Sequence, residues 1–231
     1  YYTVQPTASR SVAFFGTATY SYQGRYTISG TARYEGTNKL GKSRSARWLP
    51  TWNVSGAWNA HEEKFWKYME PAVSNFTLKA SYSLTADRGP ANVTNSLAIV
   101  QSYNPWRPFT NVKESGLQII EAENSDLTYE KKHELNIGAE VGFIENRINL
   151  AFDWYKRNNF DLIGLVNSAG TGVKITKYAN VASMKSHGVE FTLSTKNIKT
   201  KDFDWNSDFI FSHAKNEVTD LHSNSRIIEM I

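Results

Sequence analysis

The sequence predicts an all-β fold, in the form of a transmembrane, antiparallel, up-and-down β-barrel. The clearest indication is the stretch 127–162, where apolar side chains recur at every second position on both sides of a tight turn at Glu145 and Asn146. Such alternation gives a strand one apolar face and one polar face. It persists here for about nine to eleven residues per strand, which is the length that a tilted strand needs to cross a bilayer.

The composition agrees with this prediction and excludes several other classes of protein. The 231 residues are 40% hydrophobic, and no apolar run approaches the length of a transmembrane helix. Aromatic residues make up 13% of the chain, enough to supply the aromatic girdles of a membrane barrel. The lack of cysteine excludes disulfide scaffolds and thiolate metal sites. The net charge of +4, with dispersed basic residues, gives no sign of nucleic-acid binding.

Period-two alternation predicts about eight strands in all. Two lie within 127–162, and the others cover 11–22, 25–35, 48–59, 76–86, 186–196 and 203–212. A tight turn at Gln23 and Gly24 joins the first two strands, because glycine adopts a positive φ at little steric cost. The connection 61–75 carries Phe65, Trp66 and Met69 at helical spacing, which predicts a short interfacial helix or turn. The residues from about 215 onward are expected to form a polar loop.

The connections between these strands alternate between short and long. Those after the first, fifth and seventh strands are short, whereas 36–47, 87–126 and 165–181 are predicted to be long loops, the last with Gly-Thr-Gly at 170–172. Bacterial outer-membrane barrels have short periplasmic turns and long extracellular loops. The eight strands would then begin and end outside the cell. We therefore expect the chain to be an internal slice of a larger barrel rather than a complete eight-stranded one.

The pattern contains no catalytic constellation, so we do not expect an enzyme, and it indicates no cofactor or metal. His61-Glu62-Glu63 lacks the second histidine of a zinc-protease helix. Asp204 and Asp208 share the polar face of the last strand, as expected of lumen residues in any barrel. Cross-strand pairing of opposite charges is the simplest role for the other charged lumen side chains, namely Lys79, Glu140, Asp153, Arg157 and Glu190.

Five segments, in order along the chain, resemble motifs of one transporter family. They are YQGRYTISGTARYEGTNKLG (22–41), LPTWNVSGAW (49–58), FTLKASYSLTADRG (76–89), the hairpin in 127–162 and HGVEFTLSTKNI (187–198). The hairpin carries its motif at Glu130, Asn136, Gly138, Asn146, Arg147, Asp153, Trp154 and Tyr155. Together they resemble the SusC/RagA-type TonB-linked outer-membrane transporters of Bacteroidetes. Two departures are Asp87-Arg88-Gly89, where that family often has Thr-Gly-Asn, and Tyr129 in place of a common tryptophan.

The resemblance implies a 22-stranded barrel with a plug domain in the bacterial outer membrane. It also implies a SusD-like surface lipoprotein as lid, and a TonB complex that energises the import of oligosaccharides or oligopeptides. On this basis residues 1–231 are part of a single barrel domain, without its plug domain and its C-terminal strand. The alternatives are a passive porin or structural outer-membrane barrel, which would lack the plug, and a soluble β-rich binding module.

Contacts with the substrate are expected in the long loop 87–126. Tyr103, Trp106 and Phe109 offer flat apolar faces that suit sugar rings or peptide side chains. Arg88 and Arg107 can form paired hydrogen bonds with carboxylates. The competing interpretation is that the aromatic residues pack the loop against a lid protein or against neighbouring loops.

Overall fold

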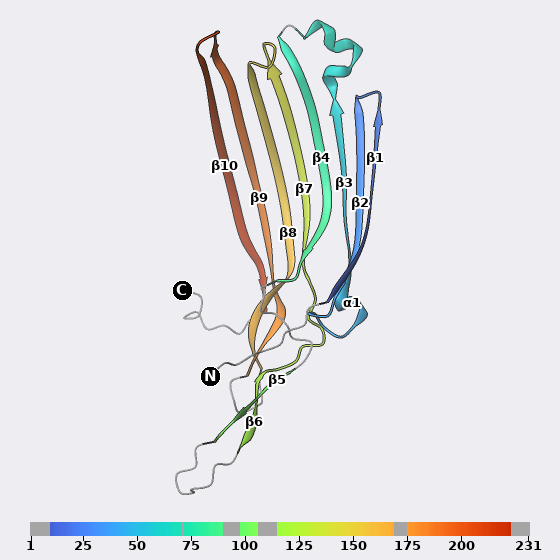
Figure 1. Ribbon diagram of the computed structural model, residues 1–231, viewed down its shortest axis with the longest axis vertical. Helices are drawn as coiled ribbons and strands as arrows, with labels where there is room; N and C mark the ends of the chain where they lie inside the picture. The colour runs from blue at the N-terminus through green and yellow to red at the C-terminus, as the bar shows by residue number, and fades with distance from the viewer. Residues whose placement is uncertain (1–9, 71, 90–97, 106–114, 169–174, 223–231) are drawn as a thin grey trace.

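A computed structural model describes residues 10–70, 72–89, 98–105, 115–168 and 175–222, which form one tall, curved sheet (Figure 1). Its strands are β1 (Ser11–Tyr22), β2 (Tyr26–Thr37), β3 (Trp48–Asn59), β4 (Val73–Asp87), β5 (Ile99–Tyr103), β6 (Gly116–Glu121), β7 (Glu130–Phe143), β8 (Ile148–Ser168), β9 (Ile175–Lys199) and β10 (Asp204–Leu221). The short helices are α1 (Arg44–Arg47), η1 (Ala60–Glu62) and η2 (Lys64–Tyr68). No helix in this part of the chain is long and apolar enough to cross a membrane.

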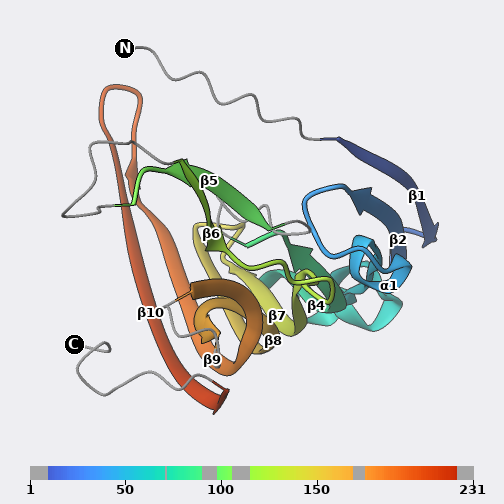
Figure 2. The ribbon, with the colours of Figure 1, turned by 90° about the horizontal axis from the view of Figure 1, so that it is seen from below.

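Eight long strands form a wall in which each strand pairs with the next in antiparallel fashion. Their order is β1-β2-β3-β4-β7-β8-β9-β10. β5 and β6 form a separate antiparallel hairpin, joined to the wall by a single parallel pairing of Glu121 with Thr176 of β9. Seen from below, the wall is an open curve (Figure 2). The eight predicted wall strands are therefore confirmed, and the hairpin adds to them.

The register keeps the apolar side chains of neighbouring strands on one face of the wall. Ile137 lies opposite Trp154, and Trp154 lies opposite Val189, so one apolar row crosses three strands. Ile137 is 46% exposed, because protein does not cover this face. The other face is polar, and its hydroxyls meet across β1 and β2 in the pairs Thr17–Thr31 (3.1 Å), Thr19–Ser29 (2.8 Å) and Ser21–Thr27 (3.1 Å).

Charged side chains on the polar face follow the predicted pairing only in part. Lys79 of β4 forms an ion pair with Glu140 of β7, as expected. Arg157 binds Glu134, with 3.1 Å between Nη2 and Oε1. Asp153 and Glu190 lie directly opposite each other, so for them the prediction of opposite-charge pairing is wrong. The apolar face sets the register, and the polar face must accept the neighbours that this register supplies.

The two ends of the wall differ as the connection lengths predict. At the upper end in Figure 1, turns join β1 to β2, β7 to β8 and β9 to β10. Gln23 and Gly24 have φ of 53° and 70°, and Glu145 and Asn146 also have positive φ, as tight hairpin turns require. The predicted short helix in 61–75 is present at this short-turn end as η1 and η2. β1 begins and β10 ends at the opposite end, which we call the long-connection end (Figure 1).

Three predicted loops contain strands, and these predictions are wrong. β5 and β6 lie within 87–126, β8 and β9 run through most of 165–181, and β10 continues past 215 to Leu221. The Gly-Thr-Gly at 170–172 lies outside the described residues. In the extensions of β8, β9 and β10 the backbone pairing continues beyond the stretch with alternating apolar residues. For example, Lys215 of β10 pairs with His187 of β9. Because polar residues occupy both faces of such a segment, its alternation carries no apolar signal.

Candidate functional site

The long-connection end contains a small buried cluster in which segments far apart in sequence meet. Its members are Leu40 (0% exposed), Leu127 (0%), Tyr129 (3%) and Tyr178 (8%). Leu40 belongs to the connection between β2 and β3, Leu127 and Tyr129 precede β7, and Tyr178 lies in β9. Burial of these apolar side chains stabilises the contact between the connections, because it removes their surface from water. We call these four residues the rim cluster.

Backbone hydrogen bonds fasten the β2–β3 connection to the segment before β7. The Gly41 amide donates to the Leu127 carbonyl at 2.8 Å, and the Lys42 amide donates to the Ser125 carbonyl at 2.9 Å. A Cβ atom on Gly41 would lie 2.0 Å from the Ser125 carbonyl oxygen. Only glycine therefore allows the two backbones to approach this closely. α1 then leads the chain back into β3.

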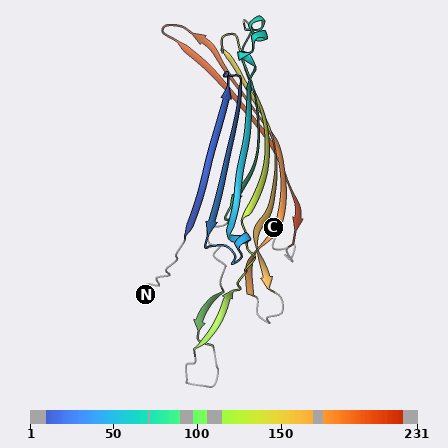
Figure 3. The same cartoon turned by 90° about the vertical axis from the view of Figure 1, so that its right-hand side faces the viewer.

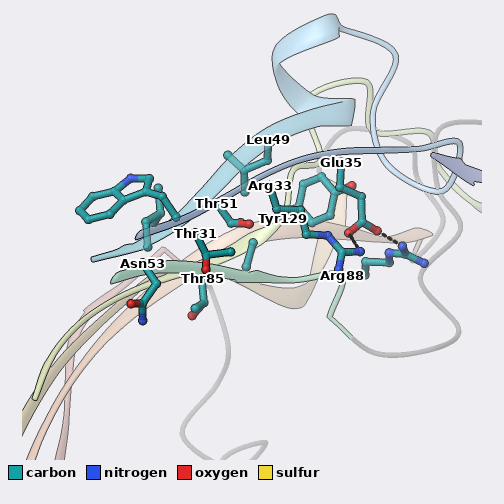
Figure 4. Close-up of a pocket in the computed structure, with 12 residues that line it drawn as sticks. Thr31, Arg33, Glu35, Leu49, Thr51, Asn53, Thr85, Arg88 and Tyr129 are labelled. Carbon is teal, nitrogen blue, oxygen red and sulfur yellow. Dashed lines mark hydrogen bonds and ion pairs between the residues drawn. The ribbon is translucent and has the colours of Figure 1, made fainter. Parts of the chain in front are cut away.

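A pocket of about 470 Å³ opens beside the rim cluster, on the polar face of β2, β3 and β4 (Figure 4). We call it the rim pocket. The polar and aromatic side chains that line it include Thr31, Arg33, Glu35, Thr51, Asn53, Thr85, Arg88 and Tyr129. Three of them are alternate residues of β2, and strand geometry places alternate residues on the same face. The pocket thus arises where the polar faces of three strands meet the segment before β7.

Glu35 lies between two guanidinium groups in the rim pocket (Figure 4). Its carboxylate binds Arg33 at 2.5 Å and also accepts a hydrogen bond from Arg88. The hydrogen bond to Glu35 raises the pKa of Arg88 above its usual value, which keeps this side chain charged. Burial raises the pKa of Tyr129, so its phenol stays neutral. The three charged groups together carry one net positive charge, and the Arg33 side chain is 50% exposed.

The chemistry of the rim pocket is that of a polar binding surface. Its threonine hydroxyls and the Asn53 amide can both donate and accept hydrogen bonds. The pocket holds two guanidinium groups and one carboxylate, so the guanidinium groups can bind an additional carboxylate from a ligand. The ring of Tyr129 adds an aromatic surface. Among the residues that the structure describes, no group of three or more His, Asp or Glu side chains could hold a metal ion.

The structure describes two of the five predicted substrate residues, and it does not bring them together at the rim pocket. Arg88 lines the pocket and binds Glu35. Tyr103 is the last residue of β5, 45% exposed, and belongs to the separate β5–β6 hairpin. Trp106, Arg107 and Phe109 lie outside the described residues. A role of these five residues in binding substrate stays a prediction.

Sequence reasoning missed Arg33, Glu35 and Tyr129 as members of this site. A signal for the first two exists, because charged residues two apart at the end of a polar strand face point the same way. Besides Arg33, Glu35 binds Arg88, which is 53 residues further along the chain. This contact depends on the order of β2, β3 and β4, so it could not be read from local pattern. Tyr129 reaches the pocket from a fourth segment, just before β7.

Comparison with known proteins identifies the family. The chain matches the family model described as TonB dependent receptor-like, beta-barrel, over residues 1–225. The TonB-dependent receptor SusC of Bacteroides thetaiotaomicron is 29% identical over 225 residues, which are 95% of this chain and 22% of SusC. The TonB-dependent receptor P3 of Formosa agariphila is 26% identical over 226 residues, again 95% of this chain and 22% of the relative. The structure of the RagAB peptide transporter shares 26% identity with a TM-score of 0.80, covering 92% of this chain and 23% of that one.

These matches confirm the predicted resemblance and the predicted barrel fold. The chain spans 22% of the length of the two curated relatives. Proteins of this kind are β-barrels of the bacterial outer membrane, so the apolar face of the wall faces lipid and the polar face, with the rim pocket, faces the lumen. The chain belongs to the TonB-dependent receptor-like β-barrel family.

Proposed function

We propose that this chain forms part of the wall of a TonB-dependent importer, which takes up oligosaccharides or oligopeptides together with a SusD-like surface lipoprotein. The observation that carries the proposal is the family match over residues 1–225. The likeness to the RagAB peptide transporter supports oligopeptides as cargo. The plug domain and the contact with TonB would belong to other parts of the protein.

The rim pocket is the place where we propose that this part of the wall contacts cargo. It lies on the lumen face at the long-connection end, which is the extracellular end of a bacterial barrel. Hydroxyl, amide and guanidinium groups match the hydroxyls of a sugar or the carboxylates and amides of a peptide. Arg88 connects this proposal with the predicted substrate residues, because it lines the pocket. The loop that carries Trp106, Arg107 and Phe109 is proposed to contribute further contacts.

The β5–β6 hairpin is proposed to contact the SusD-like lipoprotein. It extends beyond the wall at the long-connection end (Figure 3). Its exposed apolar side chains are Ile99 (40%), Val100 (52%), Leu117 (78%), Ile119 (45%) and Ile120 (43%). An apolar patch of this kind outside the bilayer is typical of a surface that binds another protein.

Transport by the intact protein tests the proposed function. Uptake of a defined mixture of oligopeptides and oligosaccharides is measured in cells with and without TonB. Accumulation that depends on TonB is expected, whereas equal uptake without TonB would favour a passive pore and contradict the proposal.

A pocket-filling substitution tests the site separately from the function. Thr51→Trp places an indole in the rim pocket, and we expect it to weaken cargo binding at least about tenfold, the effect of losing about 1.4 kcal/mol of contacts. Thr19→Trp is the matched control, since it adds the same side chain to the polar face of β1 outside the pocket lining. Equal affinity in Thr51→Trp and Thr19→Trp would remove the rim pocket from the proposal, while TonB-dependent uptake could still stand.

Co-purification tests the role of the hairpin. Leu117→Asp should reduce recovery of the co-expressed SusD-like lipoprotein, because it places a charge on the most exposed apolar residue of β6. Ile144→Asp is the control, since it adds the same charge at an exposed position in the β7–β8 turn, at the opposite end of the wall. Undiminished recovery with Leu117→Asp would show that the hairpin does not carry this contact.

A further inference from the structure

A groove of about 560 Å³ lies on the lipid-facing side of the wall, near the short-turn end. The register explains its shape. One row across β2, β3, β4 and β7 reads Ile28, Gly56, Ala80 and Ile137, so two small residues lie between two large ones. A Cβ atom on Gly56 would meet no atom closer than the Thr27 carbonyl oxygen, at 3.9 Å. The floor of the groove is therefore open because bulky side chains are missing there.

The row nearer the short turns closes this end of the groove with large side chains. Tyr26 lies opposite Trp58, and Trp58 lies opposite Leu78. All three line the groove, whose lining is almost entirely apolar. Aromatic side chains at this depth belong to the interface between the acyl chains and the headgroups of a membrane. The groove thus runs from the aromatic girdle toward the middle of the bilayer.

The connection between β3 and β4 folds onto the same side of the wall. Trp66 of η2 stacks on Phe76 with 5.6 Å between ring centroids, and its indole N–H donates to the Val73 carbonyl at 2.8 Å. Phe76 shares the lipid-facing side of β4 with Leu78, because the two are alternate residues. At the end of the groove, the Tyr26 hydroxyl donates to Glu63 at 2.6 Å. η2 is therefore held at the membrane interface, next to the groove.

The 3₁₀ geometry of η2 sorts its side chains into ridges. With about three residues per turn, side chains three apart lie above one another. Lys64 and Lys67 form a basic ridge, and Phe65 (54% exposed) and Tyr68 (92%) form an exposed aromatic ridge. Trp66, only 7% exposed, lies on the side that packs against the wall. Within the described part of the chain, no carboxylate forms an ion pair with Lys64 or Lys67.

We infer that the groove and η2 together form a binding site for one glycerophospholipid of the periplasmic leaflet. One acyl chain lies over Gly56 and Ala80, between the large side chains of the groove. Lys64 and Lys67 bind the phosphate of the headgroup, while Phe65 and Tyr68 enter the interfacial layer. The lipid is a phospholipid of the periplasmic side because the short turns of a bacterial barrel lie there. Two features distinguish this site from the rest of the lipid-facing wall. One is the apolar groove, and the other is the positive charge of η2 at the end of that groove, which matches the negative charge of a phosphate.

Lipid retention by the intact receptor tests this inference without any transport assay. The receptor is extracted in mild detergent, 1-palmitoyl-2-oleoyl-phosphatidylethanolamine is added, and native mass spectrometry measures the fraction of protein that keeps one lipid. Gly56→Leu fills the floor of the groove, and the double variant K64A/K67A removes the phosphate contacts. Each variant is expected to lower the retained fraction by about tenfold or more. Gly56→Leu removes the space for the acyl chain, and K64A/K67A removes the charge-assisted hydrogen bonds to the phosphate.

Gly16→Leu is the matched control for the groove. It adds the same side chain to β1 at a position where a Cβ atom meets no atom within 4 Å, and Gly16 is not one of the residues that line the groove. This variant should retain lipid as the unmodified receptor does. Because K64A/K67A changes only exposed side chains, it separates loss of the site from loss of folding. Unchanged retention in either Gly56→Leu or K64A/K67A, or equal loss in Gly16→Leu, would overturn the inference.

Discussion

Replacing Leu127 with alanine would test whether the rim cluster holds the β2–β3 connection in place. Leu127 is fully buried beside Leu40, Tyr129 and Tyr178, and its carbonyl accepts a hydrogen bond from the Gly41 amide. Truncating a fully buried leucine costs about 2–5 kcal/mol, because the neighbours close the resulting cavity only in part. We expect this loss to appear as local opening of the connection. The ladder of the wall strands is untouched, so global unfolding should change much less.

A loss of about 2–5 kcal/mol increases the equilibrium constant for local opening of the β2–β3 connection about thirty-fold to several-thousand-fold. The β2–β3 connection contains four sites for trypsin, namely Lys39, Lys42, Arg44 and Arg47. Cleavage follows the population of the open form when opening and closing are fast relative to proteolysis. Limited trypsin digestion of the intact protein in detergent, followed by mass spectrometry of the fragments, therefore measures the predicted change.

The control is Leu117→Ala, which removes the same atoms from a side chain that is 78% exposed. It should leave cleavage of the β2–β3 connection unchanged. If Leu127→Ala were cleaved no faster than Leu117→Ala, the rim cluster would not be what holds the connection, and the reasoning from burial would be refuted.

Two further predictions concern backbone approach and pH. Gly41→Ala should also open the β2–β3 connection to trypsin, because its Cβ atom would lie 2.0 Å from the Ser125 carbonyl oxygen. The hydrogen bond from Tyr26 lowers the pKa of Glu63, so this contact stabilises the β3–β4 connection above the usual glutamate pKa. That stability should be lost as the pH falls through the lowered pKa, and hydrogen exchange at residues 60–70, corrected for its intrinsic pH dependence, measures the loss.

Each of these predictions has a matched comparison. Gly30→Ala should behave as the unmodified protein, because a Cβ atom there meets no atom within 4 Å. Equal resistance to trypsin in Gly41→Ala and Gly30→Ala would contradict the argument from close approach. Glu63→Gln should remove the pH dependence of exchange. Protection at 60–70 that did not vary with pH in the unmodified protein would count against the role of the Glu63 carboxylate.

The sequence by itself determined the wall strands and their faces. A membrane barrel must present apolar side chains to lipid at every second position, so the local pattern carries the strand and its orientation together. This is why Ile137 and Trp154 could be placed on the apolar face, and Lys79 and Glu140 on the polar face, before their pairing was known. Turn chemistry is equally local, and Gly24 adopts the positive φ on which the prediction of a tight turn at Gln23 and Gly24 rested.

The tertiary structure alone decided which polar groups meet. Glu35 binds Arg88 because β3 brings β2 and β4 to its two sides, and Asp153 faces Glu190 because the apolar rows fix the register of β8 and β9. The extended ladders of β8, β9 and β10 also escaped the sequence pattern, since backbone pairing holds them where no apolar face is required. Alternation specifies which way a side chain points. The neighbours of a side chain belong to strands from distant parts of the sequence, and only the assembled wall brings those strands together.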